Sequence, residues 1–300
     1  MVLPNFLIIG TAKAGTTSVA NFLSQHPEAY IPDRKELNFF TMVDELPEYA
    51  APGDQEEVNE DPITNIDTYK AYFSSASGFK AIGEASTWYL YDSDAAQQIH
   101  RFLPEAKLIA ILRNPTERAF SSYCHTQLAG RETAANFAEA LQQEDFRIKN
   151  NWSPIWHYKN MGFYHQQLLK YMEIFEKEKM LILLYEDFAT DSQKFMKEIF
   201  EFLEIDSTFK PFTSVQYNKT GLHRNKMLND WISKSNPIKT FAKNVIPTDY
   251  WSLVAQKIKN MNIQKPEIQD KTKETLLETY REDILKVQDL IQRDLSRWLH

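Results

Sequence analysis

The sequence predicts an α/β fold: a single domain with a central, mostly parallel β-sheet flanked by helices. Four short runs are almost continuously apolar, which is typical of parallel strands covered on both faces. These runs are residues 6–9, 80–83, 108–112 and 180–185. Patterns of helical period separate and follow them. We therefore expect one domain over residues 1–300, with a sheet of about four or five strands.

The elements follow one another in the order strand, loop, helix. The first run ends at Gly10, and apolar side chains at helical spacing begin at Val19 after a short loop. Further helices are predicted where apolar residues recur every three or four positions, over residues 95–102, 115–128, 136–143, 163–175 and 192–203. Residues 248–300 are expected to form a helical C-terminal region, because an apolar helical period runs from Lys271 to Trp298.

Composition and charge exclude several classes of protein. Hydrophobic residues make up 43% of the chain and charged residues 25%, which is ordinary for a globular protein and excludes a disordered chain. The net charge of −7 argues against a nucleic-acid partner. The single cysteine, Cys124, excludes an intramolecular disulfide and a cysteine-cluster zinc site. With no signal-peptide pattern and no membrane-length apolar run, we expect a cytoplasmic protein with no membrane partner.

Residues 43–67 stand apart by charge. They hold nine acidic residues, no lysine or arginine, and three prolines. We interpret this segment as an irregular, solvated surface insertion. By contrast, residues 219–243 carry six basic residues and one acidic residue.

The loop after the first run has the spacing of a phosphate-binding loop. Gly10 and Gly15 flank four residues, so backbone N–H groups can turn toward an anion at a helix N-terminus. In nucleoside triphosphatases a lysine follows the second glycine, whereas here that position is Thr16 and the lysine is Lys13. ATP hydrolysis and a small-molecule kinase are therefore disfavoured. The alternative is a glycine loop with no ligand.

Several motifs together resemble the PAPS-dependent sulfotransferase family, in particular its bacterial and heparan-sulfate-type branch. Residues 10–18 look like the family's 5′-phosphosulfate loop, and residues 112–123 look like its 3′-phosphate motif. Residues 35–40 and 83–86 look like that branch, and the resemblance spans most of the chain. It implies a P-loop-like α/β core and PAPS as sulfonate donor, with PAP as product and no metal ion.

The resemblance also implies roles for individual residues. Lys13 would stabilise the leaving group, and the loop and helix start would bind the donor through Lys13, Ala14, Gly15, Thr16, Thr17 and Ser18. Arg113 and Ser121 would hold the 3′-phosphate, with Arg224 closing over it. Arg118 is interpreted instead as an ion-pair partner on the helix surface.

Glu84 is the predicted general base, carried over from the heparan-sulfate-type branch. It follows an apolar run, where a carboxylate at a strand end can project into a cleft. A structural carboxylate is the alternative. His125 lies on the same helical face as Ser121 and is a candidate second base, although a surface or packing role is equally compatible. Lys35 is a candidate contact for the sulfonate or the acceptor.

The acceptor is the least determined part of the prediction. Net charge and the acidic segment disfavour a polyanionic sugar. We expect a small-molecule alcohol or amine, with a cationic natural product such as a guanidinium alkaloid as one case. The alternatives are a glycan sulfotransferase and a nucleotide-binding protein without catalysis.

Overall fold

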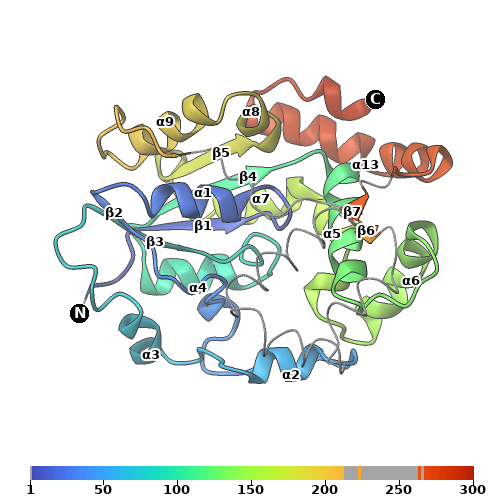
Figure 1. The fold of residues 1–300 in the computed structure, drawn as a ribbon, viewed down its shortest axis with the longest axis horizontal. Helices are drawn as coiled ribbons and strands as arrows, with labels where there is room; N and C mark the ends of the chain where they lie inside the picture. The colour runs from blue at the N-terminus through green and yellow to red at the C-terminus, as the bar shows by residue number, and fades with distance from the viewer. Residues whose placement is uncertain (1, 213–221, 224–262, 265–266) are drawn as a thin grey trace, which may run out of the picture.

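A five-stranded parallel sheet forms the centre of the computed structural model, which describes residues 2–212, 222–223, 263–264 and 267–300 (Figure 1). The strand order is β2-β3-β1-β4-β5, and every neighbouring pair is parallel. The strands are β1 (Phe6–Gly10), β2 (Ala29–Tyr30), β3 (Ala81–Ala85), β4 (Lys107–Leu112) and β5 (Met180–Leu184). The predicted α/β class and parallel sheet are confirmed.

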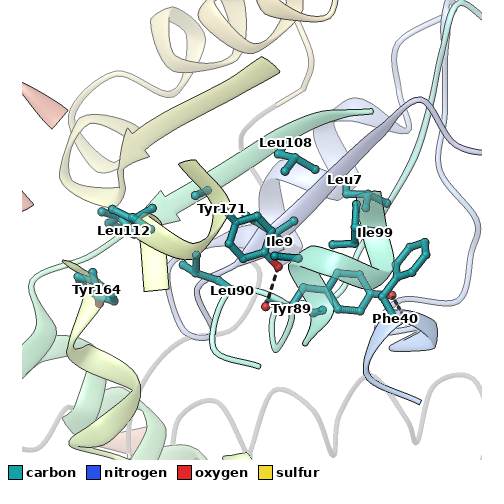
Figure 2. Packing of buried hydrophobic residues seen from close by; sticks show 14 of the residues in the cluster. Leu7, Ile9, Phe40, Tyr89, Leu90, Ile99, Leu108, Leu112, Tyr164 and Tyr171 are labelled. Atoms are coloured by element: carbon teal, nitrogen blue, oxygen red, sulfur yellow. Dashed lines mark hydrogen bonds between the residues drawn. The ribbon is translucent and has the colours of Figure 1, made fainter. Parts of the chain in front are cut away.

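Helices cover both faces of this sheet, because alternate side chains of each strand point to opposite sides. Phe6 and Ile8 of β1 pack against α1 (Thr16–Leu23) and α9 (Ser192–Phe202). Leu7 and Ile9 pack on the other face with side chains of α4 (Ala95–Phe102), α7 (Tyr164–Met172) and α13 (Asp270–Ile291). Figure 2 shows part of this second cluster. The core therefore has two apolar layers with the sheet between them.

Close packing at the sheet explains one glycine of β3. A Cβ atom added at Gly83 would lie 2.5 Å from the ring of Phe6. Any larger residue would push this ring, which is fully buried, out of its layer. Gly83 thus lets β1 and β3 pair while an aromatic side chain fills the space above them.

The predicted elements agree closely with the observed ones. Helices α4 and α5 (Pro115–Leu128) have the expected ends, whereas α6 (Phe137–Lys149) runs six residues beyond the predicted one. Strand β5 ends at Leu184 because α8 (Tyr185–Thr190) begins at the next residue. The two-residue strand β2 was not predicted, since such a short pairing leaves no periodic signal.

The acidic segment 43–67 is only in part the irregular, solvated insertion that the sequence predicts. It contains α2 (Asp54–Asn59) and the start of α3 (Ile66–Ala71). Asp54 is buried, with 1% of its surface exposed. It accepts hydrogen bonds from Ser153 N (2.8 Å) and Trp156 Nε1 (3.0 Å) and pairs with Arg131. Its carboxylate therefore ties the insertion to the body of the domain.

The C-terminal region is only partly as expected. Helix α13 and a final 3₁₀ helix (Ser296–Leu299) confirm the helical period after residue 270. However, β7 (Ile263–Gln264) pairs antiparallel with β6 (Leu222–His223), so the segment from 248 is not helical throughout. Residues 248–262 lie outside the described residues. Among the described residues, none of the helices is sufficiently long and apolar to span a bilayer.

We expect Asp54→Ala to destabilise the protein by about 3 kcal/mol, because it leaves Arg131 and two N–H donors without their buried acceptor. Glu56→Ala is the matched control, since it removes the same charge from an exposed position of the same helix. Urea unfolding of the two variants measures the difference. Equal stability of both would contradict the anchoring role of Asp54.

Candidate active site

The loop between β1 and α1 forms one wall of a cleft. Lys13 and Gly15 have left-handed backbones, with φ of 70° and 82°, and Thr16 begins the helix. A side chain at Gly15 would be strained, and its Cβ would lie 3.1 Å from the ring of Tyr185. The turn directs the N-terminus of α1 into the cleft, where helix N–H groups favour an anion.

The cleft has a volume of about 1300 Å³ and opens above the carboxyl ends of the strands. It collects most of the predicted site residues, namely Lys13, Gly15, Thr16, Thr17, Ser18, Arg113, Ser121 and His125. Ala14 is buried and does not line the cleft. Arg224 lies outside the described residues. Two motifs about a hundred positions apart in sequence therefore meet at one surface.

Lys13 lies in a strongly positive environment. Burial, together with the nearby charges of Arg113 and Arg118, lowers the pKa of Lys13 to about 8. The guanidinium of Arg113 donates to the carbonyl oxygen of Lys13 at 3.0 Å. Positive charges held so close together in a cleft attract a polyanion, and the bound polyanion reduces their mutual repulsion.

Arg113 stands at the end of β4, immediately before α5. Its guanidinium lies 4.8 Å from the centre of the Tyr185 ring and 3.6 Å from the carboxylate of Glu117. Asn114 caps α5 by accepting from the N–H of Thr116, and Pro115 occupies the first turn, so the helix begins where the proline predicts. This start places Ser121 about two turns into α5, facing the same cleft as Arg113.

Arg118 is not on the helix surface, and the sequence-based interpretation of this residue is wrong. Its side chain is completely buried and donates to the carbonyl oxygen of Tyr158. It also contacts the sulfur of Met161. Because its charge acts on Lys13 from beneath, Arg118 strengthens the positive potential of the cleft without touching it.

Glu84 does not project into the cleft, contrary to the sequence-based expectation. It lies within β3, one residue before the strand ends, on the same face as Ile82, and it is 1% exposed. Its carboxylate accepts from Ser86 Oγ at 2.7 Å and Tyr89 OH at 2.8 Å. Burial raises the pKa of Glu84 to about 7, against the lowering effect of these hydrogen bonds. The alternation of side chains along a strand explains why it faces the core.

Glu36, unlike Glu84, lines the cleft, and sequence reasoning passed over it. Its carboxylate accepts from the backbone N–H of Thr87 at 2.8 Å, and burial raises its pKa. Next to it, Lys35 Nζ donates to Thr17 Oγ1 in the first turn of α1 at 2.7 Å. The available signal was the position of Glu36 beside Lys35, in the 35–40 motif that already marked the resemblance.

His125 lines the cleft one helical turn after Ser121. Partial burial, with the charges of Lys13 and Arg131, lowers the pKa of His125 to about 4. The imidazole is therefore neutral at neutral pH and able to accept a proton or a hydrogen bond.

Comparisons with known proteins identify a family for this chain. The family model described as a sulfotransferase domain matches residues 3–245. A sulfotransferase structure from Alicyclobacillus acidocaldarius has 31% identity and a TM-score of 0.79, with 100% of both chains covered.

Curated relatives are more distant. Membrane-associated sulfotransferase kil1 of Dictyostelium discoideum is 23% identical over 79% of this chain and 64% of its own length. Carbohydrate sulfotransferase 15 of Mus musculus is 29% identical over 68% of this chain and 44% of its own length. The chain thus spans less than two thirds of these relatives. The match of the family model over most of its length shows that this chain belongs to the sulfotransferase domain family.

Proposed function

We propose that this protein transfers a sulfonate group from PAPS to a hydroxyl or amine of a small-molecule acceptor. The observation that carries the proposal is the meeting of two anion-binding motifs in one cleft. The loop after β1 presents Lys13 and a helix N-terminus, whereas Arg113 follows β4 and Ser121 lies in α5. Separate sites of this kind fit a donor with a 5′-phosphosulfate and a 3′-phosphate.

Each donor-site residue has a distinct task in this proposal. The N-terminus of α1, with Thr16, Thr17 and Ser18, binds the 5′-phosphosulfate. The planar guanidinium of Arg113 and the hydroxyl of Ser121 bind the 3′-phosphate. Lys13 donates to the oxygen that bridges phosphorus and sulfur, and so neutralises the charge that grows there as the S–O bond breaks.

Glu36 is our proposed general base. It takes the proton from the acceptor oxygen or nitrogen as that atom forms its bond to sulfur and PAP leaves with the electrons of the broken S–O bond. Of the two glutamates considered, Glu36 lines the cleft and Glu84 lies behind it. His125, which also lines the cleft, is a second acceptor contact in this proposal.

The charges of the cleft support a neutral or cationic acceptor. Among the described residues, seven acidic side chains and five lysines or arginines line it. Three of these cations lie in or beside residues 10–18, which we call the donor loop: Lys13, Lys35 and Arg113. Arg34 is already paired with Asp61 of the insertion. Of the five lining cations in the described part of the chain, Lys273 then remains for a second polyanion such as a sulfated glycan.

Part of the cleft wall is apolar, which favours an acceptor with an apolar body. It includes Met42, Val58, Ile63, Trp88 and Ile155. A cationic natural product of guanidinium type is one acceptor that fits both the acidic balance and this wall. The single cysteine supports our placement of the protein in the reducing cytoplasm.

The direct test of the function is consumption of PAPS with a panel of alcohols, amines, phenols and sugars, with product masses read for the gain of one sulfonate. We expect neutral and cationic small molecules to react, and heparan-type oligosaccharides to react poorly at low and high salt alike. A preference for the polyanion that grows as salt is lowered would contradict the electrostatic argument. Absence of PAP formation with every acceptor would contradict the activity itself.

Lys13→Ala should lower kcat by about a hundredfold or more, because one well-placed electrostatic donor is lost from the transition state. In the wild-type protein, kcat/KM should fall as pH rises through about 8, since the lowered pKa of Lys13 leaves a neutral amine above that value. Lys177→Ala, at an exposed position far along the chain, is the control. Turnover of Lys13→Ala near the wild-type rate would remove the leaving-group assignment.

Glu36→Gln and Glu84→Gln distinguish the two candidate bases. We expect Glu36→Gln to lower turnover by about a hundredfold or more with unchanged PAP affinity, because the substitution removes the base and keeps the shape. Glu84→Gln should remain at least about tenfold more active than Glu36→Gln. Steady-state kinetics with PAP titration give both quantities. Greater damage from Glu84→Gln would return the role of base to Glu84.

A further inference from the structure

A buried carboxylate held entirely by hydroxyl groups lies directly behind the cleft. Glu84 Oε1 accepts from Tyr89 OH at 2.8 Å and from Tyr69 OH at 3.4 Å, and Oε2 accepts from Ser86 Oγ at 2.7 Å. Burying a carboxylate is costly, and these bonds offset only part of that cost. An apolar residue at this position would avoid the desolvation cost, so we examine what the contacts of the carboxyl group hold in place.

One of the three hydroxyls connects Glu84 to the segment that borders the cleft. Ser86 Oγ donates to Glu84 and at the same time accepts from the backbone N–H of Asn38 at 2.9 Å. The hydroxyl of Ser86 has a single proton, and its hydrogen bond to Glu84 orients that proton toward the carboxyl group. The lone pairs of the serine oxygen then face Asn38.

The segment held in this way has an unfavourable backbone. Glu36 and Asn38 have φ of 54° and 51°, in the left-handed region that non-glycine residues rarely adopt. The last residue of β3 and the residues after it offset this strain with further hydrogen bonds. Glu36 N donates to Ala85 O at 3.0 Å, and Thr87 N donates to the Glu36 carboxylate at 2.8 Å. A turn of this kind persists only where its surroundings over-determine it.

The aromatic member of the cluster reaches the same segment. Tyr89 OH, besides donating to Glu84, lies 3.5 Å from the backbone N–H of Phe40 and can accept from it, as the dashed line in Figure 2 shows. The carbonyl of Tyr89 accepts from Tyr171 OH at 2.8 Å, which fixes Tyr89 to α7. Residues 84–89 thus form a bracket that grips residues 36–40.

Two side chains at the start of the segment that the bracket holds face the cleft. Glu36 lines the cleft, and Lys35 reaches across it to Thr17 of the donor loop. A displacement of the turn would move both groups relative to Lys13. We propose that Glu84 is a positioning residue that acts through Ser86 to hold the Glu36–Asn38 turn, and with it the general base, in register with the donor loop. The proposal rests on the function proposed above.

The test compares two variants that each remove one hydroxyl from Glu84. Ser86→Ala breaks the link to Asn38, whereas Tyr69→Phe removes the longer bond and leaves that link intact. Three quantities are measured on the full chain: kcat, the Kd for PAP, and hydrogen exchange of the Asn38 amide. We expect Ser86→Ala to lower kcat by about tenfold with PAP affinity unchanged, and to speed exchange at Asn38. Tyr69→Phe should retain kcat and the protection of Asn38.

Two results would overturn the proposal. One is an equal loss of kcat in both variants that follows their loss of thermal stability, because the cluster would then be merely structural. The other is unchanged exchange of the Asn38 amide in Ser86→Ala. The exchange measurement does not depend on turnover, so it remains informative if Glu36→Gln proves active. The experiment therefore distinguishes an incorrect assignment of the general base from an incorrect assignment of the bracket.

Discussion

Leu7 of β1 lies opposite Glu84 on one side and Leu108 on the other, and this parallel pairing places the carboxyl ends of three strands at one edge of the sheet. The loops that leave those ends must therefore meet. The first loop carries Lys13, the second carries Ser86 and Thr87 of the bracket, and the third carries Arg113. Each group of the site derives its place from strand register, so a shift in pairing would separate them all.

The meeting of these loops concentrates positive charge at a cost. Lys13 is partly buried beside Arg113, and its pKa is lowered first by burial and then by the repulsion of Arg113 and Arg118. A polyanion bound in the cleft would offset this repulsion. The same geometry explains why a buried arginine lies in α5: it supplies potential without occupying space in the cleft.

Acidic side chains on the opposite wall of the cleft balance the positive charges around Lys13. The insertion between η1 (Phe39–Thr41) and α3 brings Asp54, Glu57 and Asp61 to the cleft, and Arg34 or Arg131 pairs with each of them. These pairs hold the insertion in place and consume the arginines that could have attracted an anionic acceptor. In the proposed function, the same contacts would therefore both anchor the wall and disfavour an anionic acceptor.

Sequence alone determined the local chemistry of this protein. Continuous apolar runs predicted buried parallel strands, since such strands need apolar residues on both faces. Gly10, Gly15 and the hydroxyls after them indicated an anion-binding turn, because backbone freedom and donors are local properties. Arg113 before α5 and Ser121 within it line the same cleft, as the sequence predicted from Pro115 as the start of the helix.

Only the tertiary structure decided which side chains meet in the cleft. Glu84 and Glu36 both follow suggestive motifs, but the alternation of β3 turns Glu84 into the core while a left-handed turn brings Glu36 to the cleft. Arg118 and Asp54 are charged residues whose burial no local pattern revealed, because their partners are distant in sequence. Burial and long-range pairing depend on how elements pack, and a single sequence carries that information only implicitly.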